Sequence, residues 1–190
     1  MDKLLGLVLC GGESRRMGSD KGLLLKDGTP WALHMGQKLS PWKIPVFYSI
    51  NSNQHTAYKT ILPERHLVVD TLDLPGPLNG LFSLHRRLPK TDILLLACDM
   101  IDLDTATIDK MIRAYEENGP FDYYSYREDS EDGFFQPFCG IYTAAGLATS
   151  FGGYREKLAT DYRLQTLLKK GRIKSLSIDR PEAFKNYNTL

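Results

Sequence analysis

The sequence has almost no net charge, because 24 Lys and Arg residues offset 23 Asp and Glu residues to leave +1. Proteins that bind nucleic acid or anionic membranes usually carry a basic excess, so the overall charge indicates neither partner. The chain also lacks an apolar run long enough to cross a membrane. We therefore expect no nucleic acid and no membrane as partners, and cations that act only where they gather locally.

Cysteine is scarce, and the three residues are Cys10, Cys98 and Cys139. Their number is odd, and their spacing is not that of a metal site. All three lie in or beside apolar runs, which is typical of core thiols in a reducing compartment, so we expect a cytoplasmic protein. The apolar run 4–10 is at the lower limit of length for a secretion signal and follows a single cation, so we interpret it as a strand.

The most informative stretch is 7–21, where an apolar strand runs into a glycine-rich loop. A continuous apolar run is typical of a strand buried on both faces. Gly11 and Gly12 allow backbone N–H groups to approach an anion closely. The loop also carries three cations: Arg15, Arg16 and Lys21. This pattern predicts a loop that holds a nucleoside triphosphate, and the alternative is a basic surface turn.

Two familiar phosphate-binding loops do not fit this stretch. A P-loop places its lysine directly after the second glycine, whereas Ser19 and Asp20 separate Gly18 from Lys21. The dinucleotide-binding pattern Gly-x-Gly-x-x-Gly is not present in the loop either. If the loop binds a nucleotide, it therefore belongs to another class of nucleotide site.

Strand and helix patterns alternate along the first half of the chain. Strands are expected at 4–10, 45–50, 66–69, 92–97, 122–127, 136–142 and 173–178. Between them, Thr29 is expected to cap a helix that ends near Leu39, and Asp104 or Thr105 to cap a helix that ends near Asn118. Residues 73–80 are expected to form a rigid loop before a helix that ends near Leu88, and two short helices are expected at 145–151 and 164–170. The pattern predicts an α/β fold over residues 1–190: a single-domain, Rossmann-like, doubly wound and mostly parallel sheet with helices on both faces.

Polar residues follow the expected parallel strands. Asn51, Asp70 and Asp99 stand at the carboxyl ends of the second, third and fourth strands, and the glycine-rich loop follows the first. Parallel strands bring these ends to one edge of the sheet, where open α/β sheets bind ligands. A carboxylate at this edge suits Mg²⁺ bound to phosphate oxygens, so Asp99 is the candidate metal ligand. A helix-capping aspartate is the alternative.

Residues 9–21 read L-C-G-G-E-S-R-R-M-G-S-D-K. This segment resembles the signature L-A-G-G-x-S-x-R-M-G-x-D-K of the molybdenum cofactor guanylyltransferases of the MobA type, with Cys10 in place of the alanine. Three further segments resemble that family: 76–80 its G-P-L-x-G, 98–101 its C-D-M-P with Ile101 for proline, and 186–190 its N-x-N-T-P with Leu190 for proline. A weaker likeness, to P-L-x-x-x-Y, lies at 137–142. The resemblance extends from Leu7 to Thr189.

The resemblance implies a transfer of GMP from GTP to the terminal phosphate of molybdopterin, which forms the guanine dinucleotide cofactor and releases pyrophosphate. It implies nucleotide contacts from Leu9, Cys10, Gly11, Gly12, Lys21, Asn51, Asp70 and Asp99. It implies catalytic roles for Arg16, Lys21 and Asp99, with Mg²⁺ on Asp99, and acceptor contacts from Pro77, Leu78, Asn186 and Asn188. The nucleophile is a phosphate that is already anionic, so catalysis needs positioning and charge stabilisation and no side-chain base.

Three alternatives remain open. A cytidylyltransferase for the same pterin would share the fold but lack the Asp20–Lys21 pair, and a sugar-1-phosphate nucleotidyltransferase would carry a Gly-x-Gly-Thr-Arg type of loop. A catalytically silent nucleotide-binding homologue is the third, suggested by Ile101 and Leu190. Besides GTP and molybdopterin, other cofactor-biosynthesis proteins or acceptor molybdoenzymes are possible partners.

Overall fold

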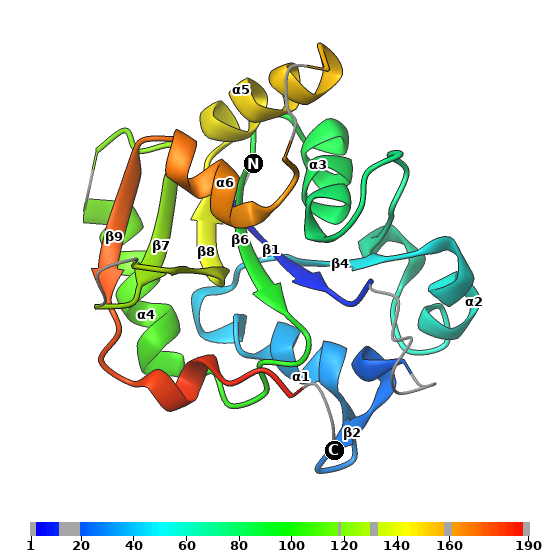
Figure 1. Ribbon diagram of the computed structural model, residues 1–190. Coiled ribbons are helices and arrows are strands. Elements are labelled where there is room, and N and C mark those ends of the chain that lie inside the picture. Colours follow the sequence, from blue (N-terminus) through cyan, green and yellow to red (C-terminus); the bar gives the residue numbers. More distant parts are fainter. Residues whose placement is uncertain (1–2, 12–19, 118, 130–132, 158–160, 188–190) are drawn as a thin grey trace.

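The computed structural model describes residues 3–11, 20–117, 119–129, 133–157 and 161–187. Its main feature is a seven-stranded sheet with the order β5-β4-β1-β6-β8-β7-β9 (Figure 1). The strands are β1 (Leu4–Leu9), β4 (Val46–Ile50), β5 (Leu67–Val69), β6 (Asp92–Ala97), β7 (Tyr123–Arg127), β8 (Phe135–Tyr142) and β9 (Ile173–Ser177). A separate two-stranded hairpin joins β2 (Leu25–Lys26) to β3 (Thr29–Pro30).

The predicted mostly parallel sheet is confirmed. β1 is parallel to β4 on one side and to β6 on the other, and β4 is parallel to β5. β8 is antiparallel to both β6 and β7, whereas β7 and β9 are parallel. The chain leaves β1 first toward β4 and β5 and then returns to β6, so the strand order reverses at β1. In open α/β sheets such a reversal opens a crevice at the carboxyl ends of the strands.

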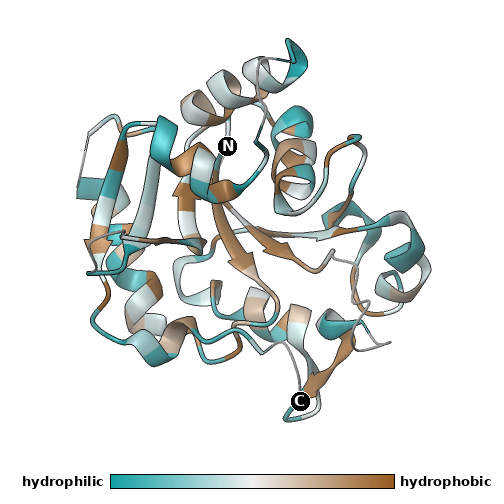
Figure 2. Ribbon diagram, viewed as in Figure 1, coloured by the Kyte–Doolittle hydropathy of each residue, from teal (hydrophilic) through white to brown (hydrophobic). Residues whose placement is uncertain are grey.

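Helices cover both faces of the sheet, as predicted (Figure 1). They are α1 (Trp31–Gln37), α2 (His55–Tyr58), α3 (Pro77–Arg87), α4 (Thr105–Glu117), α5 (Ala144–Arg155) and α6 (Leu164–Lys170). Val8 faces a core formed with α1, α2 and α4, while Leu7 and Leu9 face a second core formed with α3, α5 and α6. Successive strand residues point to opposite faces, so β1 is apolar throughout because it serves both cores (Figure 2).

The prediction that Thr29 caps a helix is wrong. Thr29 and Pro30 form β3, which pairs with β2 across a turn at Asp27 and Gly28. Both turn residues have positive φ, 51° and 77°, as a tight hairpin turn requires. The helix begins one residue later, at Trp31, and no side chain caps it. The hairpin therefore takes the residues that would otherwise have started α1.

The prediction of a loop over residues 73–80 is also wrong at its carboxyl end. Helix α3 begins at Pro77, so the last four residues of the Gly-Pro-Leu-Asn-Gly segment form its first turn. Proline suits the first helical position because its missing N–H would be unpaired there. Gly76, with φ of 73°, supplies the left-handed conformation just before the helix. This segment is thus a helix start and not a free loop.

Two smaller expectations are confirmed. The side chain of Asp104 accepts a hydrogen bond from the Thr107 N–H at 2.7 Å, so it caps α4. Cys10, Cys98 and Cys139 are free and buried. Among the residues that the structure describes, none of the helices combines the length and hydropathy of a membrane span.

A buried glycine of α1 generates a prediction about stability. A methyl group on Gly36 would lie 2.1 Å from the hydroxyl oxygen of Tyr48, which is only 5% exposed on β4. Gly36→Ala is therefore expected to lower the free energy of unfolding by about 1–3 kcal/mol through overpacking. In the control Gly152→Ala, on α5, the methyl group meets nothing within 4 Å. This control is expected to gain about 0.5–1 kcal/mol from the lower flexibility of alanine. Urea unfolding of both variants measures the difference, and a Gly36→Ala protein as stable as the wild type would contradict the packing.

Candidate functional site

The carboxyl ends of β1, β4, β5 and β6 meet at one edge of the sheet. Gly11, which follows β1, lies against the polar groups that follow β4 and β5. A methyl group built on Gly11 would lie 3.2 Å from Oδ2 of Asp70 and 3.6 Å from the backbone nitrogen of Asn51. The structure thus brings together Gly11, Asn51 and Asp70, and glycine leaves the space between them open.

The backbone of the strand end is already engaged in hydrogen bonds. The N–H groups of Cys10 and Gly11 both donate to the carbonyl oxygen of Ser49, at 2.9 and 3.0 Å. The Leu9 carbonyl accepts from the Cys98 N–H at 3.1 Å. A ligand that contacts the Leu9 carbonyl must use its second lone pair. Burial raises the pKa of the Cys10 thiol well above its ordinary value, which agrees with a structural and not a catalytic cysteine.

Asp70 is a half-buried carboxylate directed at the loop. Its Oδ1 accepts a hydrogen bond from the Ser49 hydroxyl at 2.9 Å. Burial raises the pKa of Asp70, and the hydrogen bond from Ser49 opposes this shift by stabilising the charged form. Oδ2 lies toward Gly11. Asp70 therefore presents Oδ2 in a fixed direction, and Oδ1 keeps a second lone pair for another donor.

Asp20, just before Lys21, is held by three donors. It accepts from the Gly22 N–H at 3.0 Å, from Nε2 of Gln54 at 2.6 Å and from the Tyr58 hydroxyl at 3.0 Å. The bond from Gly22 caps the short 3₁₀ helix Lys21–Leu23, on which Lys21 lies. Asp20 therefore fixes the start of this helix and the backbone of Lys21.

Gln54 joins the loop to the end of β4. Its Nε2 also donates to the Cys10 carbonyl at 3.0 Å, and its Oε1 accepts from the Asn51 N–H at 2.8 Å. The Asn51 side chain in turn accepts from the N–H groups of Asn53 and Gln54. Asn51 and Gln54 thus form a capping box. Gln54 and Tyr58 are not among the site residues predicted from the sequence, although an Asn three residues before a Gln is a signal for the capping box that includes Gln54.

Lys21 and Asp99 form an ion pair across the point where the strand order reverses. The Lys21 ammonium lies 2.9 Å from Oδ2 of Asp99, and the two side chains are 20% and 16% exposed. The turn after β6 forms although Ile101 replaces the proline of the family signature C-D-M-P. The N–H of Met100 donates to the carbonyl oxygen of Ala97 at 3.3 Å, and Ile101 is buried. A cation and a carboxylate thus lie together at the carboxyl ends of β1 and β6.

The C-terminal segment reaches the same place. The N–H of Tyr187 donates to the carbonyl oxygen of Asp99 at 3.0 Å, and the Tyr187 hydroxyl bonds to the carboxylate of Asp102. These contacts hold Tyr187, the neighbour of the exposed Asn186, against the turn that follows β6. Three predicted site residues, Gly12, Arg16 and Asn188, lie outside the described residues.

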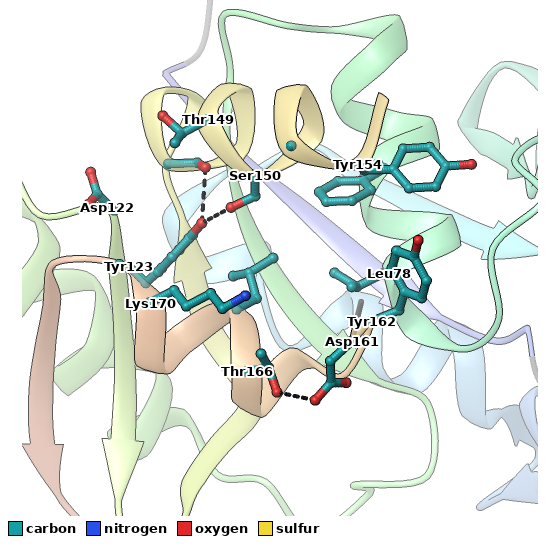
Figure 3. Close-up of a pocket in the computed structure, with 15 residues that line it drawn as sticks. Leu78, Asp122, Tyr123, Thr149, Ser150, Tyr154, Asp161, Tyr162, Thr166 and Lys170 are labelled. Carbon is teal, nitrogen blue, oxygen red and sulfur yellow. Dashed lines mark hydrogen bonds between the residues drawn. The ribbon is translucent and has the colours of Figure 1, made fainter. Parts of the chain in front are cut away.

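Two cavities lie beside the start of α3. The first, of about 270 Å³, lies between α3, α5 and α6, with Leu78 and the rings of Tyr154 and Tyr162 at one end (Figure 3). Leu78 itself is only 3% exposed and packs in the core. The second, of about 570 Å³, is lined by Pro77, Pro137 and Phe138 among others. Both cavities include Asp161 and Tyr162, so they adjoin each other.

The second cavity lies toward the edge of the sheet at which the carboxyl ends of β1, β4, β5 and β6 meet. β8 is antiparallel to β6, with Leu95 opposite Gly140, so the first half of β8 runs beside the carboxyl end of β6. Pro137 and Phe138 belong to that half. The predicted acceptor residue Pro77 therefore faces a cavity on the same edge as Asp99.

The metal-binding capacity of the site is small. In the described ranges, no group of three or more His, Cys, Asp or Glu side chains could hold a metal ion. Asp99 offers a single carboxylate. That donor set fits Mg²⁺, which is commonly bound by one or two carboxylates, water and substrate phosphates, and it does not fit a metal held by protein alone.

Comparisons with known proteins show which family the sequence resembles over most of its length. The family model for the MobA-like NTP transferase domain matches residues 6–171. A molybdenum cofactor biosynthesis bifunctional protein of Synechocystis sp. is 31% identical over 76% of this chain and 40% of its own length. A molybdenum cofactor guanylyltransferase of Burkholderia ambifaria is 40% identical over 50% of this chain and 48% of its own length. The chain thus spans less than half the length of these two relatives.

Solved structures show the same fold. The molybdopterin-guanine dinucleotide biosynthesis protein A of Archaeoglobus fulgidus superposes with a TM-score of 0.73, at 16% identity, over 97% of this chain and 92% of that one. The bifunctional IspDF of Campylobacter jejuni superposes with a TM-score of 0.75, at 13% identity, over 98% of this chain and 52% of that one. At these identities the likeness concerns the architecture alone.

The hydrogen bond from Tyr58 to Asp20 generates a prediction about the loop. Tyr58 is fully buried, so Tyr58→Phe removes one of the three donors to Asp20 and little else. It is expected to lower the free energy of unfolding by about 1 kcal/mol. It is also expected to weaken binding of a nucleoside triphosphate, because Asp20 positions Lys21. Thermal unfolding and calorimetric titration measure the two effects.

The control is Tyr126→Phe, since Tyr126 is equally buried and its hydroxyl donates to the Thr107 carbonyl, away from the site. The control is expected to lose stability and to keep its nucleotide affinity. Equal losses of affinity in both variants would show that general packing, and not Asp20, is responsible.

Proposed function

Because the chain belongs to the MobA-like NTP transferase family, we propose that it transfers GMP from GTP to the terminal phosphate of molybdopterin and releases pyrophosphate. One observation supports this proposal most directly. Lys21 and Asp99 form an ion pair at the carboxyl ends of the parallel strands. At the same edge of the sheet, Gly11 has no side chain and leaves space in front of the Asp70 carboxylate. This combination supplies a cation for phosphates, a carboxylate for Mg²⁺ and a carboxylate for a base.

Asp70 is the proposed guanine-binding group. Guanine carries N1–H and N2–H donors on one edge, and a carboxylate can accept both. The half-buried setting of Asp70 makes an unpaired acceptor costly, so a base that lacks these donors is rejected. Asn51 and the backbone of Leu9, Cys10, Gly11 and Gly12 complete the proposed base site.

The proposed chemistry needs charge stabilisation and not a base. The attacking phosphate of the acceptor is already anionic, and the obstacles are repulsion between the two anions and charge on the leaving pyrophosphate. Arg16 and Lys21 would hold the triphosphate, and Asp99 would hold Mg²⁺. When bound, Mg²⁺ supplies neutralisation of phosphate charge. Lys21 already lies beside Asp99, so its ammonium needs little movement to contact a phosphate in the crevice.

We place the acceptor on the side of Asp99 that lies away from the proposed base site. Asn186 and Asn188 are amides that can bond to phosphate and to a pterin edge without adding charge. Pro77 and Leu78 border the two adjoining cavities, whose aromatic side chains suit a planar ring. In this arrangement the nucleotide and the acceptor would meet at Lys21 and Asp99.

The base preference tests the proposal. Calorimetric titration with GTP, CTP and ATP is expected to show GTP binding at least about tenfold more tightly, because only guanine satisfies Asp70. Incubation with GTP, Mg²⁺ and molybdopterin is expected to release pyrophosphate, and omission of the acceptor to prevent it. Equal affinity for CTP would exclude a guanylyltransferase, and tight GTP binding without pyrophosphate release would indicate a silent homologue.

The charge of Asp99 is expected to be essential for turnover. Asp99→Asn keeps the size of the side chain but removes the charge that pairs with Lys21 and would hold Mg²⁺. Turnover is expected to fall by about a hundredfold or more, while GTP still binds through its base. The control Asp179→Asn removes the exposed ion pair with Lys110 and is expected to retain turnover. Near-normal turnover of Asp99→Asn at low Mg²⁺ would contradict the assignment.

A further inference from the structure

Ser49 connects the two parts of the proposed base site. It lies on β4, next to β1, and is 1% exposed. Its carbonyl oxygen accepts from the N–H groups of both Cys10 and Gly11, and its hydroxyl donates to Oδ1 of Asp70. One buried residue thus holds the first residues of the glycine-rich loop with its backbone and the Asp70 carboxylate with its side chain.

Gly80 of helix α3 makes this arrangement possible. A methyl group on Gly80 would lie 2.0 Å from the Ser49 hydroxyl oxygen and 2.8 Å from its Cβ. Such contacts are far inside van der Waals range, and Ser49 is buried, so the hydroxyl could not stay where it bonds to Asp70. The helix backbone therefore packs directly on Ser49 and closes the space beside its hydroxyl.

Asn79, the preceding residue, holds the chain that leaves Asp70. Its side-chain oxygen accepts from the Leu72 N–H at 3.1 Å, and its amide nitrogen donates to the carbonyls of Leu72 at 2.7 Å and Leu74 at 3.1 Å. Asn79 is 8% exposed, so these bonds are shielded from water. Helix α3 therefore fixes the segment directly after Asp70 and also the residue that bonds to its carboxylate.

We propose that Ser49, together with Asn79 and Gly80 of α3, positions the Asp70 carboxylate and thereby sets the base specificity of the site. With Oδ1 bonded to Ser49, Oδ2 is directed toward Gly11, where the base edge is proposed to lie. This inference rests on the proposed function, because it takes guanine as the base. It also divides the Gly-Pro-Leu-Asn-Gly segment: Pro77 and Leu78 border the acceptor cavities, and Asn79 and Gly80 serve the nucleotide.

The test compares GTP with inosine triphosphate, which lacks the exocyclic amino group of guanine. In the wild type, GTP is expected to bind more tightly because Asp70 accepts from both N–H groups. In Ser49→Ala the Asp70 carboxylate loses its donor and can rotate. The ratio of the affinity for GTP to the affinity for inosine triphosphate is therefore expected to fall about tenfold. Asn79→Ala is expected to reduce the same ratio. The control Ser125→Ala removes a buried serine hydroxyl of β7 that donates to the Gln136 carbonyl, and it is expected to leave the ratio unchanged.

A double-mutant cycle separates positioning from general loss of structure. If Ser49 acts through Asp70, Ser49→Ala should change the ratio little further in an Asp70→Asn background. Additive effects, or a Ser49→Ala protein that keeps the wild-type ratio, would overturn the inference and leave the proposed function standing. A wild-type protein that binds CTP as tightly as GTP would overturn both.

Discussion

The whole arrangement depends on the parallel pairing of β1 with a strand on each side. Leu7 and Val8 are completely buried on opposite faces, while hydrogen bonds to β4 and β6 occupy both edges of the strand. A strand confined in this way cannot slip by one residue, because a slip would exchange its two faces and misalign both ladders. The residues after β1, β4 and β6 therefore lie together at one edge of the sheet. The positions of these polar residues are thus set by the pairing of an apolar strand.

The carboxylates at this edge of the sheet are each held by donors from the protein. Gln54 and Tyr58 donate to Asp20, Ser49 donates to Asp70, and Lys21 pairs with Asp99. Most of these donors come from the scaffold and are buried or half-buried. Asp20 is bound at both oxygens, whereas Asp70 and Asp99 are each bound at one and present the other in a restricted direction. Such preorganisation reduces the ordering that a bound nucleotide would have to supply.

Much of this could be predicted from the sequence, and the limits have physical causes. Apolar runs and helical periodicity predict 92–97 and 164–170 with the bounds that the structure has, because burial governs both segments. The convergence of Gly11, Asn51 and Asp70 follows from parallel strands alone. Thr29 is wrongly placed in a helix cap because pairing across a two-residue turn overrides its local preference. Ser49 and Tyr58 escape prediction, since their importance lies in partners that only the folded chain brings near.

The central place of β1 has a consequence for synthesis of the chain on the ribosome. The strand is synthesised well before residues 92–97, with which one of its edges pairs. Until then a six-residue apolar strand with an open edge is exposed, which is the kind of segment that associates with other chains. Closing so distant a ladder is slow. The nascent chain therefore passes through an interval in which chaperone binding competes with aggregation, and slower, cooler expression favours the folded product.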